Sequence, residues 1–238
     1  MRAGFEMMRW DMLLQWRSHL YSATLFTTLS LGLVAFLLQP YPIETKWYAV
    51  LLFTDPAIVG LSFVGAFMLM ERGGRTLSAL SVAPLTANTY LAGKVLSFSL
   101  LGVLSGLAIV LVVTRGHVNL LLAVFALALT NGVAVLIGFG LAAGVRSVNA
   151  FLVRMSVAML VAVLPLLAFF DVGPAALHWC LAIIPSLSML TLLEISLTTE
   201  GGFPSSLLWH SLYLFVWSGA GWIYAHRSYE PFVTSDAA

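Results

Sequence analysis

The sequence has few charged residues: Asp, Glu, Lys and Arg make up 9% of its 238 residues, against roughly 25% in a soluble globular domain. Hydrophobic residues reach 61%, which excludes an ordinary soluble domain. The net charge of +1 provides no basic field for a nucleic acid backbone, so we expect no nucleic acid partner. The single cysteine, Cys180, has no partner for an internal disulfide, and the five histidines are scattered without metal-ligand spacing. We therefore expect a membrane protein with no metal site.

Apolar runs of about 20 residues without a central charge indicate membrane spans, because a charge at the bilayer centre costs on the order of 3 kcal/mol. We predict an all-α integral membrane protein with six transmembrane helices, forming one transmembrane domain over residues 1–238. The expected spans are residues 20–38, 47–70, 95–113, 118–143, 148–170 and 207–225.

The apolar stretch at residues 177–193 is the one ambiguous segment. Pro185 lies in its middle and is followed by Ser186 and Ser188, so we interpret residues 175–198 as short re-entrant helices. Counting the stretch as a seventh span would also place Arg227 on the outer side, against the positive-inside rule.

The distribution of Lys and Arg predicts that both termini face the cytoplasm. With this orientation only Lys46 and Arg115 lie outside. The remaining basic residues fall on cytoplasmic segments: Arg2, Arg9, Arg17, Arg72, Arg75, Lys94, Arg146, Arg154 and Arg227.

Residues 1–19 have the pattern of an amphipathic helix lying in the cytoplasmic membrane interface. The alternative is an extension of the first span. At helical spacing one face is apolar and the other polar: Phe5, Met8, Met12, Leu13, Trp16 and Leu20 fall on the first, and Arg2, Glu6, Arg9 and Gln15 turn away from it.

The connection at residues 71–94 is the longest on the cytoplasmic side. Gly73 and Gly74 allow a turn, Thr76 is a candidate N-cap, and Pro84 closes a short helix. Leu77 and Leu80 are apolar residues three positions apart on this short helix, where a soluble partner with a matching groove could bury them.

This segment resembles the corresponding segment of ABC-2 type permeases, also called type V exporters, which are membrane subunits of ATP-binding-cassette exporters. These permeases read Glu-Arg, three residues, Thr-Leu, then Leu, a Pro-Leu pair, and Gly-Lys or similar at the next span. The matching residues are Glu71, Arg72, Thr76, Leu77, Leu80, Pro84, Leu85, Gly93 and Lys94. Gly73-Gly74 departs from the family, which often has Glu or Gln and then Gly. The layout of spans and re-entrant helices is similar too.

The resemblance implies that the segment around Thr76 to Ala83 is a coupling helix that docks on a nucleotide-binding subunit. Coupling to the ATPase would then involve Glu71, Arg72, Arg75, Thr76, Leu77, Leu80 and Pro84. The alternative for Glu71, Arg72 and Arg75 is simple anchoring of the span ends, which by itself does not predict the Thr-Leu, Leu, Pro-Leu spacing.

The sequence lacks the Gly, four residues, Gly-Lys-Ser/Thr pattern of a phosphate-binding loop. We therefore expect no nucleotide site or cofactor in this chain, with ATP and Mg on a separate ABC ATPase subunit. The resemblance further implies a second permease copy, in a homodimer, or a sister permease, together with membrane lipid, in the bacterial inner membrane.

Asp55 is the one acidic residue inside an expected span, and Pro56 follows it. It is interpreted as lining the substrate pathway, as pairing across the bundle, or as an N-cap if the span begins at Pro56. Asn131 lies in the middle of the fourth span, where we expect a hydrogen bond to a neighbouring helix. Further candidates for the substrate pathway are Phe63, Phe67 and Phe98.

We conclude that the chain exports a hydrophobic or amphipathic compound: a drug or antibiotic, a peptide or a lipid. It is not itself an enzyme, because the motifs of intramembrane proteases are absent from the sequence. The alternative function is a secondary transporter or channel without an ATPase partner, although the sequence shows no internal repeat.

Overall fold

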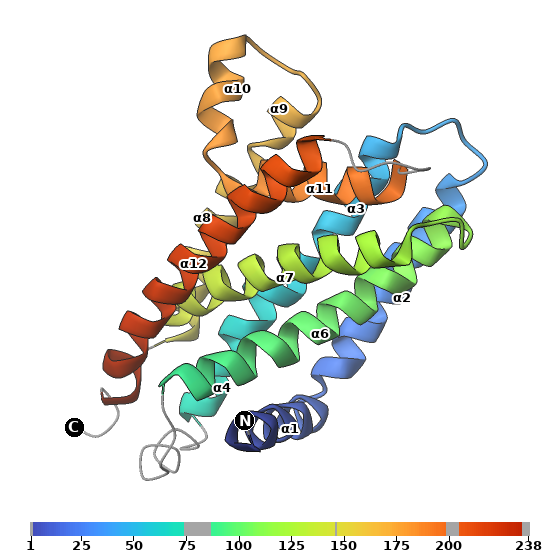
Figure 1. Cartoon of the computed structure of the whole chain (residues 1–238). Helices are drawn as coiled ribbons and strands as arrows, with labels where there is room; N and C mark the ends of the chain where they lie inside the picture. The colour runs from blue at the N-terminus through green and yellow to red at the C-terminus, as the bar shows by residue number, and fades with distance from the viewer. Residues whose placement is uncertain (1, 74–86, 146, 199–204, 235–238) are drawn as a thin grey trace.

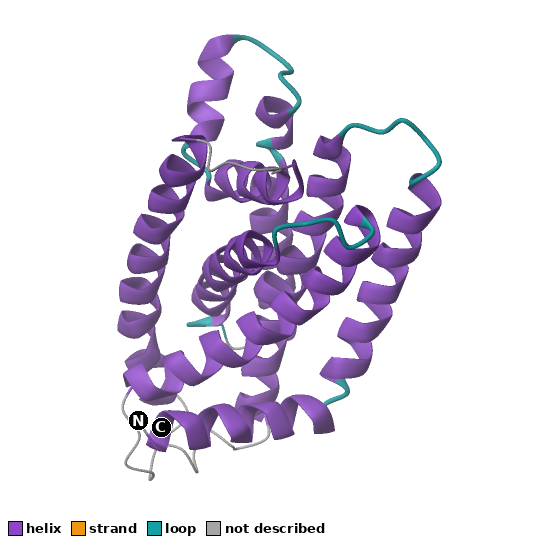
Figure 2. Ribbon diagram, turned by 45° about the vertical axis from the view of Figure 1, so that its right-hand side comes forward, coloured by secondary structure: helices purple, strands orange, loops and turns teal. Residues whose placement is uncertain are grey.

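The computed structural model describes residues 2–73, 87–145, 147–198 and 205–234, without the side chains of residues 2–7, 72–73, 87 and 229–234. All regular structure in these ranges is helical (Figure 2). This confirms the predicted all-α membrane protein. The expected hairpin residues Arg75, Thr76, Leu77, Leu80 and Pro84 lie outside the described ranges.

The chain begins with helix α1 (Arg2–Arg17), which is followed by α2 (Leu20–Leu38). The two helices are separated at His19, whose φ of 58° lies in the left-handed region. The break falls where the sequence predicts the change from the interfacial helix to the first span. Figure 1 shows α1 lying across one end of the bundle, while α2 runs along it.

The second span consists of three helical segments in one continuous stretch: α3 (Thr45–Pro56), the π-helix η1 (Ala57–Phe63) and α4 (Val64–Gly73). Pro56 lacks the N–H that an α-helix needs, and the wider π-turns begin directly after it. Since the helix starts at Thr45, Asp55 lies well inside it. The alternative that Asp55 is an N-cap at the start of the span is therefore wrong.

The third and fourth spans are α6 (Ala87–Thr114) and α7 (Leu120–Ala142), followed by α8 (Val148–Val163) and the short α9 (Leu166–Phe169). The side chains of Asn119 and Ser147 cap α7 and α8 by accepting hydrogen bonds from backbone N–H groups. Helix α6 begins earlier than expected, so residues 87–94 of the predicted connection belong to this helix.

The segment predicted as re-entrant forms α10 (Ala175–Ala182) and α11 (Pro185–Thr198), which meet at 94°. Pro185 is the first residue of α11, so the helix breaks at the proline, as predicted. Helix α12 (Ser205–Thr234) completes the described fold. Figure 1 places the end of α12, the end of α4 and the start of α6 at the same end of the bundle as α1, opposite α9, α10 and α11.

Five helical stretches among the described residues are long and apolar enough to cross a membrane, and the bent pair α10 and α11 would make a sixth. Helix α12 is not among these stretches, although its 30 residues extend over about 45 Å. Its Trp, Tyr, His and Ser residues lower its hydropathy. The five stretches are Leu20–Leu38, Thr45–Glu71, Asn88–Thr114, Leu120–Ala142 and Val148–Phe169.

Helix α7 is the centre of the packing, because it contacts α6, η1, α4, α11 and α12. Close approach depends on glycine at several of these contacts. A Cβ on Gly102 of α6 would overlap the amide of Asn131 on α7, and one on Gly138 of α7 would meet the backbone carbonyl oxygen of Gly60. The small residues therefore allow the helix backbones to approach closely, as glycines do at contacts between membrane helices.

We predict that Gly102→Ala lowers the thermal stability of the detergent-solubilised protein by several degrees, because overpacking typically costs 1–3 kcal/mol. The matched control is Gly32→Ala on α2, since nothing lies within 4 Å of a Cβ built there. Equal melting temperatures for the two variants would contradict the close approach of α6 and α7.

Candidate functional site

The structure describes the residues that precede and follow the predicted coupling hairpin. Glu71 lies near the end of α4, and α6 starts after the segment that lies outside the described residues. Glu71 is 5% exposed, so it is not a charge anchored in water at the end of a span. The backbone of Arg72 belongs to α4, but its side chain is not described.

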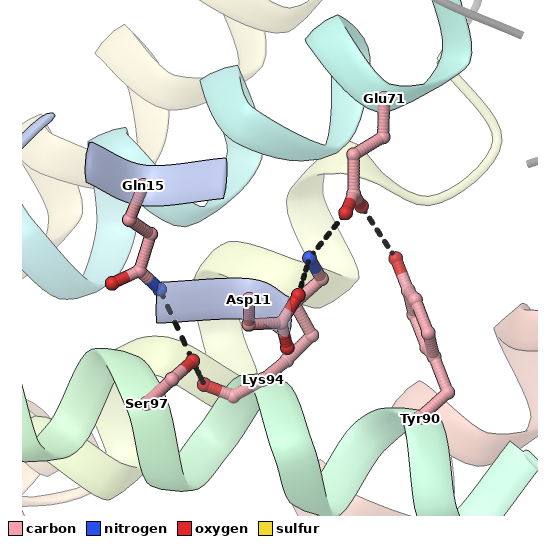
Figure 3. Close-up of polar contacts among 6 residues, drawn as sticks. All are labelled: Asp11, Gln15, Glu71, Tyr90, Lys94 and Ser97. Atoms are coloured by element: carbon pink, nitrogen blue, oxygen red, sulfur yellow. Dashed lines mark hydrogen bonds and ion pairs between the residues drawn. The ribbon is translucent and has the colours of Figure 1, made fainter. Parts of the chain in front are cut away.

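Glu71 is part of a buried charged cluster centred on Lys94 (Figure 3). The Lys94 Nζ lies 2.6 Å from Glu71 Oε1 and 2.7 Å from Asp11 Oδ1, and the side chains of Lys94 and Asp11 are fully buried. The Tyr90 hydroxyl donates a hydrogen bond of 2.9 Å to Glu71 Oε2. We call Asp11, Glu71, Tyr90 and Lys94 the Lys94 cluster; it joins α1, α4 and α6.

Two aromatic rings also lie close to the ammonium group of Lys94. Lys94 Nζ lies 4.2 Å from the centroid of the Phe67 ring and 5.3 Å from that of Tyr90. Phe67 in turn packs edge-on against Phe98, with ring centroids 5.5 Å apart. These rings exclude water and attract the cation through their faces, which strengthens its attraction to the two carboxylates.

Burial raises the pKa of Asp11 from 3.8 to about 6. Desolvation of the carboxylate is the largest cause; the Lys94 charge opposes it, and the Glu71 charge adds to it. With Asp11 and Glu71 ionised, the cluster carries one more negative than positive charge. A proton on Asp11 would balance it.

One helical turn away, α1 and α6 are joined again. Gln15 Nε2 donates to Ser97 Oγ at 3.1 Å, and Ser97 Oγ donates to the Lys94 carbonyl oxygen at 3.1 Å. The Gln15 side chain is fully buried, while Leu13 and Trp16 of the apolar face are exposed, so at this point the polar side of α1 faces α6. Asp11 and Gln15, four residues apart, together form the side of α1 that contacts α6.

None of Asp11, Gln15, Tyr90 and Ser97 was among the predicted site residues. Gln15 was expected only on the polar face of residues 1–19, and Lys94 only in the hairpin pattern and among the cytoplasmic basic residues. The available signal was the helical spacing of polar residues on two helices. Asp11 and Gln15 lie four apart, while Tyr90, Lys94 and Ser97 follow each other at intervals of four and three.

The polar intramembrane candidates Asp55 and Asn131 make separate contacts away from the Lys94 cluster. The Ser105 hydroxyl of α6 donates to Asp55 Oδ1, and Ser105 and Thr28 hydroxyls lie 2.6 Å apart, so α3, α6 and α2 are linked. Asp55 therefore pairs across the bundle. Asn131 donates to the carbonyl oxygen of Leu127 in its own helix at 2.9 Å, and not to a neighbouring helix as expected.

An apolar cavity of about 340 Å³ lies between the bundle and α8. It is bounded by α3, η1, α7, α8, α12 and the junction of α10 and α11. None of the predicted pathway residues lies in its wall: Asp55, Asn131, Phe63, Phe67 and Phe98 are all absent from the lining. Residues that do line it include Pro56, Ala57, Leu61, Ala162, Ser186 and Trp217.

The model of the fluoroquinolones export permease protein family matches residues 3–237. The chain belongs to this family. The match covers nearly the whole chain and confirms the resemblance to ABC-2 type permeases that the hairpin pattern indicated. A comparison with curated proteins found no match. The permease is accordingly a multi-pass membrane transport subunit rather than a catalytic enzyme. In its described residues, no group of three or more His, Cys, Asp or Glu side chains could hold a metal ion.

We predict that Lys94→Met strongly destabilises the permease, because it leaves two buried carboxylates without their cation. Breaking a buried ion pair in this way typically costs 3–5 kcal/mol. Lys46→Met is the matched control, since Lys46 pairs with an Asp171 side chain that is 76% exposed. Thermal unfolding in detergent should show a much lower melting temperature for Lys94→Met alone. A comparable loss in both variants would argue against the Lys94 cluster as a structural centre.

The raised pKa of Asp11 predicts a pH dependence of stability. Between pH 4 and about 6 the native carboxyl holds a proton that the unfolded chain has lost, so the native state is favoured less as the pH rises through this range. Asp11→Asn removes this dependence. The melting temperature of the wild type, minus that of Asp11→Asn, should therefore fall from pH 4 to pH 7. A constant difference would show that Asp11 titrates alike in both states.

Proposed function

We propose that the permease is the membrane-spanning subunit of an ABC exporter in which a separate nucleotide-binding subunit, with ATP and Mg, supplies the energy. The observation that carries this proposal is the Lys94 cluster at the base of the hairpin. A force applied to residues 74–86 enters the membrane domain through the end of α4 and the start of α6. Glu71, Lys94 and Asp11 bind these two ends and α1 into one unit.

A continuous helical path connects this unit to the cavity. Helix α4 carries Glu71 at its hairpin end and continues into η1, whose residues Ala57 and Leu61 line the cavity. The π-turns of η1 interrupt the regular α-helix, and π-turns inside α-helices frequently lie at functional sites. Displacement of the hairpin would therefore change the wall of the cavity without any further connecting element.

The cavity supports export of a hydrophobic or amphipathic compound. Its volume of about 340 Å³ is at the lower end of the range for small-molecule sites. This favours a drug or antibiotic over a peptide or a lipid. The name of the family refers to fluoroquinolones, a class of small molecules, and agrees with that choice.

A complete exporter would contain two permease subunits, either two copies of this chain or the chain and a sister permease. Helix α8 offers an apolar exposed face for this contact or for membrane lipid, and the same helix closes one side of the cavity. The exposed residues of this face include Leu152, Val153, Val157, Leu160 and Val161. We place the complex in the bacterial inner membrane with α1 and both termini on the cytoplasmic side, following the distribution of Lys and Arg.

The alternative of a secondary transporter is supported by one observation. Asp55 is a fully buried carboxylate inside a span, and such residues often mark ion pathways. However, its contact with Ser105 and its absence from the cavity wall are equally those of a link between helices. The exporter therefore remains our conclusion.

We predict that the tagged permease, extracted in mild detergent, co-purifies with a soluble protein that contains a phosphate-binding loop. Leu77→Asp with Leu80→Asp should abolish the association, because the sequence predicts that a partner's groove buries these two positions, and charged side chains cannot be buried there. Ser78→Asp with Ser81→Asp adds the same charges one position along and should retain it. Recovery of the permease without any ATPase under these conditions would favour a secondary transporter or channel.

A further inference from the structure

The apolar cavity has one polar feature that helix packing does not explain. Ser186, the second residue of α11, lines the cavity and is 3% exposed, and its Oγ has no hydrogen-bond partner. A buried hydroxyl without a partner is costly, and most such groups in proteins are satisfied. Because Ser186 lines the cavity, its hydroxyl is placed to pair with a hydrogen-bonding group that enters the cavity.

The position of Ser186 also indicates which kind of group would pair with it. Ser186 is in the first turn of α11, where the helix dipole is positive and backbone N–H groups lack partners within the helix. A hydroxyl can donate its proton, so both features favour an acceptor oxygen, such as that of a ketone or an amide.

The remaining wall of the cavity determines the charge of the occupant. None of the side chains that line it is charged: apart from Ser186 and the thioether of Met189 they are aliphatic or aromatic, and Trp217 and Phe53 supply aromatic rings. A charged group placed here would lose its hydration without gaining a counter-ion, which costs several kcal/mol. An uncharged ring compound would lose only unfavourable contact with water.

We propose that this cavity binds an uncharged, largely apolar ring compound through an acceptor oxygen that pairs with Ser186. The inference rests on the proposed export function and specifies the chemical form of the cargo. A compound that exists in charged and uncharged forms would bind here in its uncharged form. A lipid acyl chain suits the cavity less well, because it has no acceptor oxygen and leaves the Ser186 hydroxyl without a hydrogen-bond partner.

The test uses three naphthalene probes of nearly equal size. Prodan is uncharged and carries a ketone, its trimethylammonium analogue is a permanent cation, and a third analogue has a methylene group in place of the ketone. Native mass spectrometry of the purified permease in detergent counts the probe molecules bound to each chain. Ala162→Phe fills the cavity, and Val163→Phe, at an exposed position on the same helix, is the matched control.

Prodan should bind saturably at one molecule per chain, at least about 30-fold more tightly than the cation. Ala162→Phe should abolish binding, and Val163→Phe should not. Ser186→Ala should weaken the binding of prodan by roughly three- to tenfold, since a hydrogen bond of this kind is worth about 1 kcal/mol. The affinity for the analogue without the ketone should stay unchanged.

Equal binding of the cation, or binding that Ala162→Phe does not reduce, would overturn the assignment. Equal loss of both uncharged probes in Ser186→Ala would overturn the role of the hydroxyl. Displacement of prodan by fatty acid, with no preference for the ketone, would make the cavity a lipid site. No ATPase takes part in this measurement, so a negative result leaves the proposed ATP-driven export untouched, and failure of the co-purification leaves the binding result valid.

Discussion

The burial of one ammonium group, that of Lys94, determines how the hairpin end of the permease is built. A lysine in this position is stable only with opposite charge beside it, and Glu71 and Asp11 supply that charge from two other helices. The three helices must therefore stay together. Because α1 and α6 are joined a second time through Gln15 and Ser97, α1 is held to α6 at two points one helical turn apart.

The second span connects this end of the molecule to the cavity. Pro56 ends the regular α-helix, and the π-turns that follow place Ala57 and Leu61 in the cavity wall. Gly60 and Gly138 allow the same segment to pack closely against α7. The proposed coupling would carry motion of the hairpin along this span to η1, a π-helical segment of the kind that frequently lies at functional sites. This arrangement places the irregular part of the span next to the proposed cargo.

Much of the fold could be predicted from the sequence, because apolar runs, basic residues and proline positions act locally. The long helices, the break before α2 and the bend at Pro185 are of this kind. The Lys94 cluster could not be predicted, since a polar side of α1 normally faces water, and only the position of α6 shows that Asp11 and Gln15 are buried. The cavity was missed for a similar reason: its wall comes from six elements, and no local pattern identifies it.

The most direct test asks whether α1 and the hairpin base move as one body. Gln15→Cys with Ser97→Cys, in a chain with Cys180→Ser, places two thiols where a short bis-methanethiosulfonate reagent can bridge them, since the native Gln15 amide already spans the gap to Ser97. Cargo export and ATP hydrolysis by the reconstituted exporter are then measured before and after cross-linking. We predict that the cross-linked protein keeps both activities, because α1 and α6 stay in contact throughout the cycle. Loss of export on cross-linking, restored by a reductant, would show that the two helices must separate and would contradict this description of coupling.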